Sequence, residues 1–505
     1  MGRILSCIVK NKKFAATTEN SSANAWNLNF GDGNLNNWND KVQNKGRVRP
    51  VSALNKEETN NDIIEMIDFN TLLEAYFDCR RHKRKTVGAT EFEMNYMSNL
   101  VQLLDEINSR QYKIGKSICF VVKYPRHREV FAGQFRDRII HHYIALRLEP
   151  LFESQFSDRT YNCRKGKGQL AGIRQLQQDI REVSENYTKD AHVMGIDLKG
   201  FFMSIYKPLL ARMVDDFIIK NYRGEDKEDL RWLCNMVVMH HPEKDCEKKS
   251  ADYLWQFLPK EKSLFTNGED RGVAIGNLFA QLFANFLLSK LDWKIDYYCK
   301  HHVRYVDDMV LVARRKETLL RLMPMIRETL ASLGLRLNEK KFYFQHYTKG
   351  VRFVGAIIKR DRIYSVNNTV NNYRRSVRKL NDAAKVGNIE AINHAIQSVN
   401  SYLGIFSHYN EYGMKRKILK EELSKEAWQY FTVKGHFQSI HLRRKFNIDI
   451  KYRKMANEIM NHRIEERKDV PREMEISRML DAGHELEIYE TPEGKIHIEI
   501  TSADK

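Results

Sequence analysis

Two features common in secreted and membrane proteins are missing from this sequence. No apolar run reaches the roughly 18 residues that a membrane-spanning helix needs, and lysines 10, 12 and 13 interrupt the start of the chain before the apolar core of a signal peptide. The seven cysteines are scattered, with no C-x-x-C pair and no Cys/His array at zinc spacing. These absences predict a cytoplasmic protein in a reducing compartment, without a membrane partner, disulfides or structural zinc.

What the sequence has in excess is positive charge. Its 505 residues include 84 Lys and Arg against 65 Asp and Glu, which gives a net charge of +19 and a pI near 9.4. Lys and Arg provide nucleic-acid affinity by neutralising phosphates, so a polyanionic partner is expected. A soluble basic protein without such a partner is the alternative. The length suffices for about two to four domains.

Two adjacent carboxylates, Asp307 and Asp308, lie between two short apolar and β-branched runs within 303–312. This pattern predicts a strand, a tight turn and a second strand. Because successive side chains of a straight strand point to opposite faces, a turn is needed for Asp307 to project from the tip with its neighbour close by. A divalent cation is the simplest counter-charge, since oxygen-rich sites suit Mg²⁺.

A third carboxylate, Asp197, ends another short apolar run and is followed five residues later by Phe202. Alone, the two adjacent aspartates would predict a solvated turn. Three carboxylates, however, can hold a pair of metal ions about 3.5–4 Å apart for in-line phosphoryl displacement. The whole pattern resembles motifs A and C of bacterial and phage reverse transcriptases, and the resemblance covers roughly 68–430.

The resemblance implies the α+β fold of a right-hand polymerase, with a palm of antiparallel strands backed by helices. The divisions expected in chain order are a poorly ordered Asn-rich extension (1–65), N-terminal helices and fingers (66–195), the palm (196–360), a helical thumb (361–430) and a basic C-terminal extension ending in a hairpin (431–505). No further acidic quartet indicates a ribonuclease H domain, and no Cys/His module indicates an endonuclease.

The implied activity is RNA-directed DNA polymerisation, a nucleotidyl transfer that makes cDNA from an RNA template, a DNA or RNA primer and deoxynucleoside triphosphates. Two Mg²⁺ ions, with Mn²⁺ as an alternative, are expected at Asp197, Asp307 and Asp308, with the backbone of Leu198 as a further ligand. Phe202 takes the position of the family's steric gate against the ribose 2′-hydroxyl, which implies a preference for deoxynucleotides.

A predicted hairpin of strands 118–123 and 128–132 fits the fingers of reverse transcriptases, which close over the triphosphate. Arg128 is the first candidate for contacting this triphosphate, because a planar guanidinium engages phosphate oxygens bidentately. Lys123 and Arg126 are weaker candidates.

The stretch 271–281 resembles motif B, but Ile275 and Gly276 stand where most reverse transcriptases carry Gln and Gly. Ile-Gly-Asn with a downstream Gln, here Gln281, is typical of the diversity-generating branch and of defence-associated relatives. Ala280 departs from that pattern, which usually has Ser. An apolar Ile275 beside the nascent base pair would remove a polar contact to the substrate, which predicts error-prone copying.

Further along the chain, 334–341 resembles motif D and 351–356 resembles the primer-grip hairpin of motif E. In motif D, Lys340 or Lys341 is expected to protonate the leaving pyrophosphate, with phosphate screening as the alternative role.

The Asn-rich stretch before residue 66 resembles the hypervariable end of target proteins of diversity-generating retroelements. The hypothesis is that it is template-repeat sequence read in frame and that the polymerase starts near Met66. The protein would then be the error-prone enzyme of such an element, with a small basic accessory protein as partner. Two alternatives are a phage-defence reverse transcriptase and a non-catalytic, maturase-like RNA-binding protein.

Overall fold

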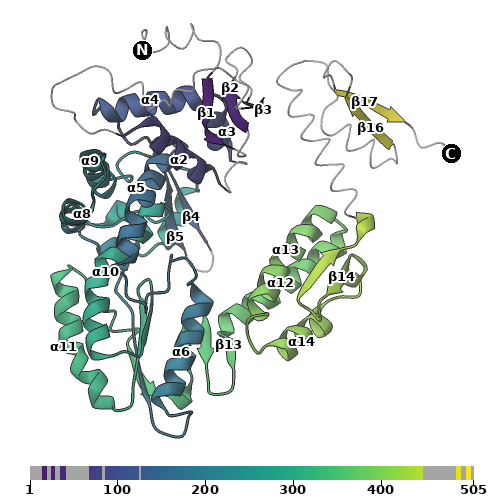
Figure 1. The fold of residues 1–505 in the computed structure, drawn as a ribbon. Coiled ribbons are helices and arrows are strands. Elements are labelled where there is room, and N and C mark those ends of the chain that lie inside the picture. Colours follow the sequence, from purple (N-terminus) through teal and green to yellow (C-terminus); the bar gives the residue numbers. More distant parts are fainter. Residues whose placement is uncertain are drawn as a thin grey trace. The chain divides into compact units, whose positions relative to one another are not determined.

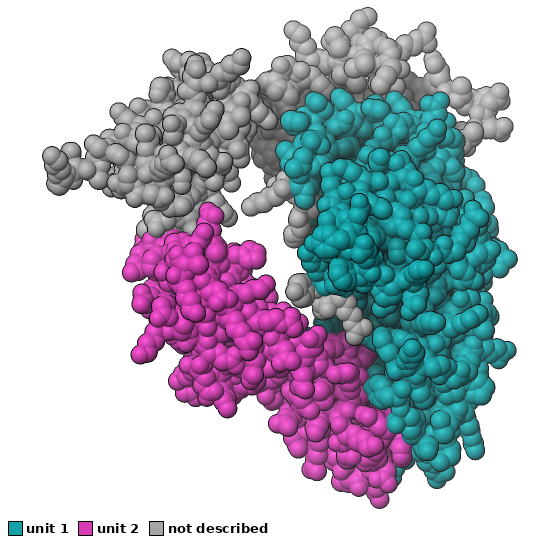
Figure 2. Space-filling view, turned by 180° about the vertical axis from the view of Figure 1, so that it is seen from behind, with its two compact units in different colours: residues 1–172, 194–344 teal, residues 173–193, 345–505 magenta. Residues whose placement is uncertain are grey.

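The computed structural model describes residues 67–81, 86–123 and 127–446 in full, and the backbone of five further strands nearer the two ends of the chain. The chain divides into two compact units (Figure 2). Unit 1 comprises Met1–Gly172 and Met194–Phe344, and unit 2 comprises Ile173–Val193 and Gln345–Lys505. Among the described helices, none is both long and apolar enough to cross a membrane.

Three of the terminal strands lie in the segment that was expected to be poorly ordered. β1 (Phe14–Glu19), β2 (Asn24–Leu28) and β3 (Leu35–Asp40) form an antiparallel sheet. Composition did not predict this sheet, because strand pairing is satisfied by backbone hydrogen bonds and a polar sequence does not prevent it. The rest of that prediction, and the start near Met66, concern residues outside the described ones. At the other end, β16 (Glu485–Glu490) and β17 (Ile496–Thr501) form the expected antiparallel hairpin.

Unit 1 begins with a layer of helices, α2 (Phe69–Arg80), α3 (Val87–Met94), α4 (Tyr96–Asn108) and α5 (Phe135–Glu153) (Figure 1). The N-terminus of α2 is capped by Asp68, whose carboxylate accepts a 2.7 Å hydrogen bond from the Thr71 N–H. Leu72 and Tyr76 are buried in the main core, whereas Phe77 is 48% exposed.

A second layer contains the predicted fingers hairpin. β4 (Ser117–Val122) pairs antiparallel with β5 (Arg128–Ala132) and parallel with β7 (Cys246–Lys248), so the sheet order is β5-β4-β7. Val122 lies opposite Arg128 at the open end of the hairpin. Three short 3₁₀ helices follow β7 in sequence: η2 (Asp252–Phe257), η3 (Lys260–Lys262) and η4 (Leu264–Thr266).

The third layer is a four-stranded sheet of order β10-β6-β9-β8, built from β6 (His192–Ile196), β8 (His302–Tyr305), β9 (Asp308–Ala313) and β10 (Tyr343–His346). The helices of this part of the chain are α7 (Phe201–Ser204), α8 (Lys207–Asn221), α9 (Lys227–Met239), α10 (Leu278–Tyr298) and α11 (Lys316–Ser332). α11 packs on β9 and on α10, and α10 packs on α5, so one continuous hydrophobic core joins sheet and helices. The predicted α+β architecture with helix-backed antiparallel strands is confirmed.

Unit 2 contains most of α6 (Gln169–Val183), the antiparallel sheet of β11 (Val351–Phe353), β12 (Ala356–Ile358) and β13 (Ile363–Ser365), and a helical body. That body consists of α12 (Asn367–Val386), α13 (Ile389–Phe406) and α14 (Tyr412–Glu422), followed by the hairpin β14 (Phe431–Lys434) and β15 (Ser439–Leu442). The 3₁₀ turns η5 (Tyr347–Lys349) and η6 (Ala427–Gln429) complete it. These helices occupy the stretch assigned to the thumb, and the proposed domain limits stay predictions.

Candidate active site

The structure brings the three predicted carboxylates together. Asp197 directly follows β6, Asp307 lies in the turn between β8 and β9, and Asp308 is the first residue of β9. Because β6 and β9 are neighbours in the sheet, the ends of these strands meet. Burial, together with the carboxylate of Asp197, raises the pKa of both Asp307 and Asp308, so the three acidic side chains lie within electrostatic reach of one another. The strand–turn–strand prediction is confirmed, with Tyr305 paired to Asp308.

The turn that carries these aspartates has an unusual backbone. Val306 has φ = 59°, in the left-handed region that a β-branched residue adopts only under constraint. Two hydrogen bonds provide that constraint. The Val306 N–H donates to Asn162 Oδ1 at 2.9 Å, and Arg304 Nη1 donates to the Val306 carbonyl at 2.9 Å.

Below the turn lies a buried polar network that sequence analysis missed. Arg304 is fully buried and forms a two-point ion pair with Asp292, with Nε–Oδ1 2.7 Å and Nη2–Oδ2 2.5 Å. Thr160 Oγ1 donates to Asp292 Oδ2 at 2.9 Å, and Asn162 Nδ2 donates to Asn285 Oδ1 at 2.8 Å. The sequence feature that could have revealed this network is Arg304 itself, a charged residue within a short, otherwise apolar strand. The network supports the turn from beneath.

The electrostatics of the site favour the binding of a cation. Burial, followed by repulsion from Asp307 and Asp197, raises the pKa of the Asp308 carboxyl to about 7. Burial and Asp197 likewise raise the pKa of Asp307, against smaller opposing effects of Lys341 and Arg128. Carboxylates kept this close are stabilised in their charged form by a cation. Their oxygens are the donors that hard divalent ions such as Mg²⁺ prefer, so the residues present fit the expected metal pair.

Asp197 has two further partners from the predicted motif D. Lys341 Nζ donates to Asp197 Oδ1 at 2.6 Å, and Asn338 Nδ2 donates to Asp197 Oδ2 at 2.9 Å. The sequence left the choice between Lys340 and Lys341 open. In the structure the ammonium at the carboxylates belongs to Lys341, whereas Lys340 is exposed and has no hydrogen bond or ion pair with any described residue. Of these two adjacent lysines, only Lys341 contacts the carboxylates.

Leu198 and Phe202 follow Asp197 in the same segment of the chain. Leu198 forms an isolated antiparallel bridge with Leu337. The two hydrogen bonds of this bridge use the Lys199 N–H and the Asp197 carbonyl, so the carbonyl of Leu198 is not consumed by it. Phe202 is half-buried against the main core, and its backbone carbonyl accepts from the Val273 N–H at 2.9 Å. The roles as metal ligand and steric gate stay predictions.

The structure describes two of the three residues that were predicted to contact the triphosphate. Arg128 is exposed on β5 and is close enough to Asp307 to lower the pKa of that carboxyl. Lys123 is exposed just after β4 and has no ion pair among the described residues, and Arg126 lies outside them. The geometry therefore supports Arg128 as the first candidate for contacting a triphosphate.

Motif B is attached to the fingers hairpin through its backbone. The Phe131 N–H donates to the Ile275 carbonyl at 2.9 Å. Gly276 has φ = 123°, and a Cβ there would lie 2.6 Å from the Phe131 carbonyl oxygen, so only glycine fits. The Ile275 side chain packs on a small apolar cluster that includes Phe131. Gln281 accepts a hydrogen bond of 3.0 Å from the Cys163 thiol, and a contact to substrate stays a prediction.

Glu129, next to Arg128, is a buried carboxylate that sequence analysis missed. It is 1% exposed and accepts hydrogen bonds from Ser263 Oγ at 2.7 Å, from the Leu264 N–H at 2.9 Å and from Trp255 Nε1 at 3.3 Å. These donors lie in the segment 252–266 (η2 to η4), which precedes motif B and is here termed the insertion. Glu129 therefore fixes that insertion to the fingers hairpin, beside the strand residue expected to contact substrate.

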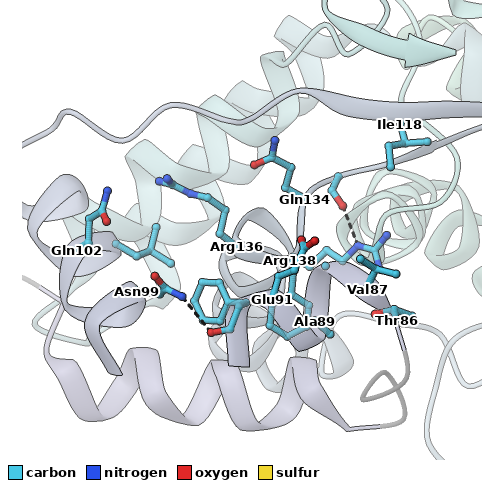
Figure 3. A pocket seen from close by; sticks show the side chains of 15 residues that line it. Thr86, Val87, Ala89, Glu91, Asn99, Gln102, Ile118, Gln134, Arg136 and Arg138 are labelled. Carbon is cyan, nitrogen blue, oxygen red and sulfur yellow. Dashed lines mark hydrogen bonds between the residues drawn. The ribbon is translucent and has the colours of Figure 1, made fainter. Parts of the chain in front are cut away.

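A separate cavity of about 770 Å³ lies among the N-terminal helices (Figure 3). It is lined by α3, α4, β4 and the start of α5. Arg138 Nε donates to the Gly133 carbonyl at 3.0 Å, and Asn99 Nδ2 donates to the Phe92 carbonyl at 3.0 Å, as the dashed lines show. None of the residues predicted for the active site lines this cavity.

Two solved structures of telomerases match part of this chain. Apo telomerase from Candida tropicalis shares 12% identity with a TM-score of 0.39, over 61% of this chain and 58% of that chain. Telomerase from Candida albicans, in complex with a TWJ fragment of telomeric RNA, shares 12% identity with a TM-score of 0.37, over 62% and 58%. This chain thus spans a little over half the length of either structure.

No curated protein matches the chain. A sequence family, however, does match it. The family described as reverse transcriptase (RNA-dependent DNA polymerase) matches residues 127–358. This span includes Asp197, Asp307 and Asp308, together with Arg128 and Ile275. Residues 127–358 therefore match a reverse transcriptase domain over slightly less than half of the chain.

Proposed function

We propose that this enzyme makes cDNA from an RNA template and a DNA or RNA primer, with Asp197, Asp307 and Asp308 as the catalytic carboxylates. The observation that carries the proposal is the convergence of these three side chains from two separate chain segments onto one partly buried site, where burial and their mutual repulsion raise the pKa of Asp307 and Asp308. With the Leu198 carbonyl they would hold two Mg²⁺ ions, or Mn²⁺ as an alternative. Such ions activate the primer 3′-hydroxyl and stabilise the leaving pyrophosphate.

The chain's own residues have distinct parts in this proposal. The Arg128 guanidinium, with Lys123 as a second cation, binds the triphosphate and orients it toward the carboxylates. Phe202 excludes a ribose 2′-hydroxyl by its bulk. Lys341 neutralises Asp197 and is better placed than Lys340 to meet the charge that develops on pyrophosphate.

Primer extension on an RNA template with Mg²⁺ tests the catalytic assignment. Asp307→Ala is expected to lower the extension rate by at least about 1,000-fold, because the metal ligands act as a unit. RNA binding should persist, since phosphate contacts by Lys and Arg dominate that affinity. Asp216→Ala, at an exposed aspartate on α8, is the matched control and should extend at the wild-type rate. Undiminished extension by Asp307→Ala would overturn the assignment.

We further propose that the enzyme is the error-prone polymerase of a diversity-generating retroelement and works with a small basic accessory protein. The proposal is supported by the Ile275–Gly276 pair of motif B and by the Asn-rich start of the chain. Ile275→Gln is expected to raise fidelity at template adenines, and sequencing of the cDNA measures it. Unchanged misincorporation would refute the role of Ile275. A template repeat and a target gene in the flanking DNA would distinguish this role from phage defence.

A further inference from the structure

Unit 2 contains a basic hollow that takes no part in the proposed catalytic site. It has a volume of about 280 Å³ and is formed by α6, the turn after α6, and the connection between β12 and β13. The lining residues carry guanidinium, amide and phenol groups: Arg174, Gln177, Gln178, Arg181, Asn186, Tyr187 and Arg360. All of them belong to unit 2, so the hollow is complete within one compact body.

The helix α6 presents these polar groups because it is amphipathic. Ile173, Leu176 and Ile180 bury one face of the helix, while Arg174 and Arg181 lie exposed on the other. Seven residues separate the two arginines, which is about 10 Å along the helix axis. Arg174 forms no hydrogen bond or ion pair with any residue that the structure describes. Its charge is therefore available to a ligand.

The turn after α6 holds an aromatic ring at the hollow in a strained backbone. Glu185, Asn186 and Tyr187 have φ values of 48°, 57° and 65°, all in the left-handed region. For residues other than glycine this region costs roughly 1–2 kcal/mol each. Hydrogen bonds hold the turn in place: the Asn186 N–H donates to the Arg181 carbonyl at 2.8 Å, and Arg181 Nε donates to Asn186 Oδ1 at 2.8 Å. Strain of this kind concentrates at ligand sites.

The third arginine completes the hollow from the other chain segment. The Arg360 guanidinium lies 5.8 Å from the centre of the Tyr187 ring. Its neighbour Asp361 approaches Arg360 Nε at 3.5 Å, but the two side chains are 64% and 86% exposed, so this pair neutralises little. Glu182, an acidic residue of α6, accepts a hydrogen bond from Gln178 at 2.7 Å. Three guanidinium groups therefore face the hollow with weak compensation.

We infer that this hollow binds the sugar-phosphate backbone of single-stranded RNA, with one base stacked on Tyr187. Two arginines about 10 Å apart along a helix are too far apart to share one phosphate and suit successive phosphates of a strand. An aromatic ring flanked by arginine is the usual surface for an unpaired base. The inference rests on the proposed function, because RNA is then the template of the enzyme, and it adds a second RNA contact away from the carboxylates.

Binding of a labelled single-stranded RNA to the full-length protein, measured by fluorescence anisotropy over a salt series, tests this site. For Arg174→Gln/Arg360→Gln the slope of log K against log salt should become shallower by about 1.4, at about 0.7 for each lost phosphate contact. That change corresponds to about tenfold weaker binding near 0.15 M salt. Arg212→Gln/Arg321→Gln, at two exposed arginines on α8 and α11, removes the same charge elsewhere and should leave the slope closer to wild type.

Two further measurements separate stacking from charge. Tyr187→Leu should weaken RNA binding about tenfold without changing the salt slope, whereas Tyr187→Phe should bind like wild type. Inorganic phosphate should compete poorly. Displacement of RNA by millimolar phosphate would identify an isolated anion site and overturn the inference, as would equal slopes for the two double variants.

Primer extension on a short preformed template–primer duplex is measured in parallel. It should be unchanged in Arg174→Gln/Arg360→Gln, because the hollow does not include the carboxylates. If wild type does not extend the primer, the proposed function fails. If extension is normal and the RNA-binding slopes do not differ, only the RNA site fails.

Discussion

The buried ion pair of Arg304 and Asp292 allows stability and active-site positioning to be separated by mutation. Both side chains are inaccessible and are joined by two hydrogen bonds, of 2.7 and 2.5 Å. Removing one partner of such a pair leaves an uncompensated buried charge and costs about 3–5 kcal/mol, whereas replacing both with apolar residues is often neutral. We expect Asp292→Leu to lower the free energy of unfolding by about 3–5 kcal/mol, and Arg304→Met/Asp292→Leu to regain most of that loss.

Catalytic activity is expected to respond differently from stability. The double variant still lacks the Arg304 Nη1 donor that binds the Val306 carbonyl at 2.9 Å. Without it the strained turn at Val306 loses one of its two hydrogen bonds, and the adjacent aspartates shift. Because a displacement of about 1 Å can reduce a rate about 100-fold, the extension rate of the double variant should fall about 10- to 100-fold while the protein stays folded.

Urea unfolding followed by tryptophan fluorescence measures the stability, and single-turnover primer extension with Mg²⁺ measures the rate. Arg327→Met is the matched control. Arg327 pairs with Glu339 at 2.7 Å, but these side chains are 54% and 58% exposed, so its loss should cost no more than about 1 kcal/mol. If the double variant recovered both stability and rate, Arg304 would not position the turn and the reasoning would be refuted.

Three other predictions follow from single contacts. Gly276→Ala should abolish primer extension, because its Cβ would lie 2.6 Å from the Phe131 carbonyl oxygen, whereas Gly404→Ala, with open space around it, should extend normally. Glu129→Gln should destabilise the insertion before motif B by about 1.5–3 kcal/mol, the range for hydrogen bonds to a charged group; faster limited proteolysis there would show it, and an unchanged rate would contradict it. Burial, reinforced by Lys207, lowers the pKa of His240 to about 4 from its ordinary 6.5, so its neutral form stabilises the fold above pH 6.5 and that contribution is lost as the pH falls toward 4. Urea midpoints at pH 7.5 and 5 should therefore differ less in His240→Gln than in wild type.

Several parts of the site could be predicted from short stretches of sequence. The hairpin that carries Asp307 and Asp308 follows from two apolar runs around a polar turn, since strand and turn preferences are local. The fingers hairpin was predicted for the same reason, with Arg128 on its second strand. Gly276 could be singled out from its place in the motif B stretch, but the contact with the Phe131 carbonyl that requires glycine there could not. For the two hairpins the deciding preferences lie within a few residues.

Other parts depended on contacts between distant residues, which no local pattern reveals. Asn162 bonds to the turn at Val306 across 144 positions, and Glu129 bonds to Ser263 across 134. The choice of Lys341 over Lys340 depends on the direction in which each side chain points once Asn338 has docked on Asp197.

The amino-acid sequence alone determined which groups can take part in chemistry here: the carboxylates of Asp197, Asp307 and Asp308, together with Gly276 of motif B and Arg128 of the fingers hairpin. Only the folded chain decided what holds them, because burial turns ordinary polar residues such as Arg304 and Asp292 into obligatory partners. A charge removed from water must be paired, and the partner is whichever side chain the packing of strands and helices places beside it.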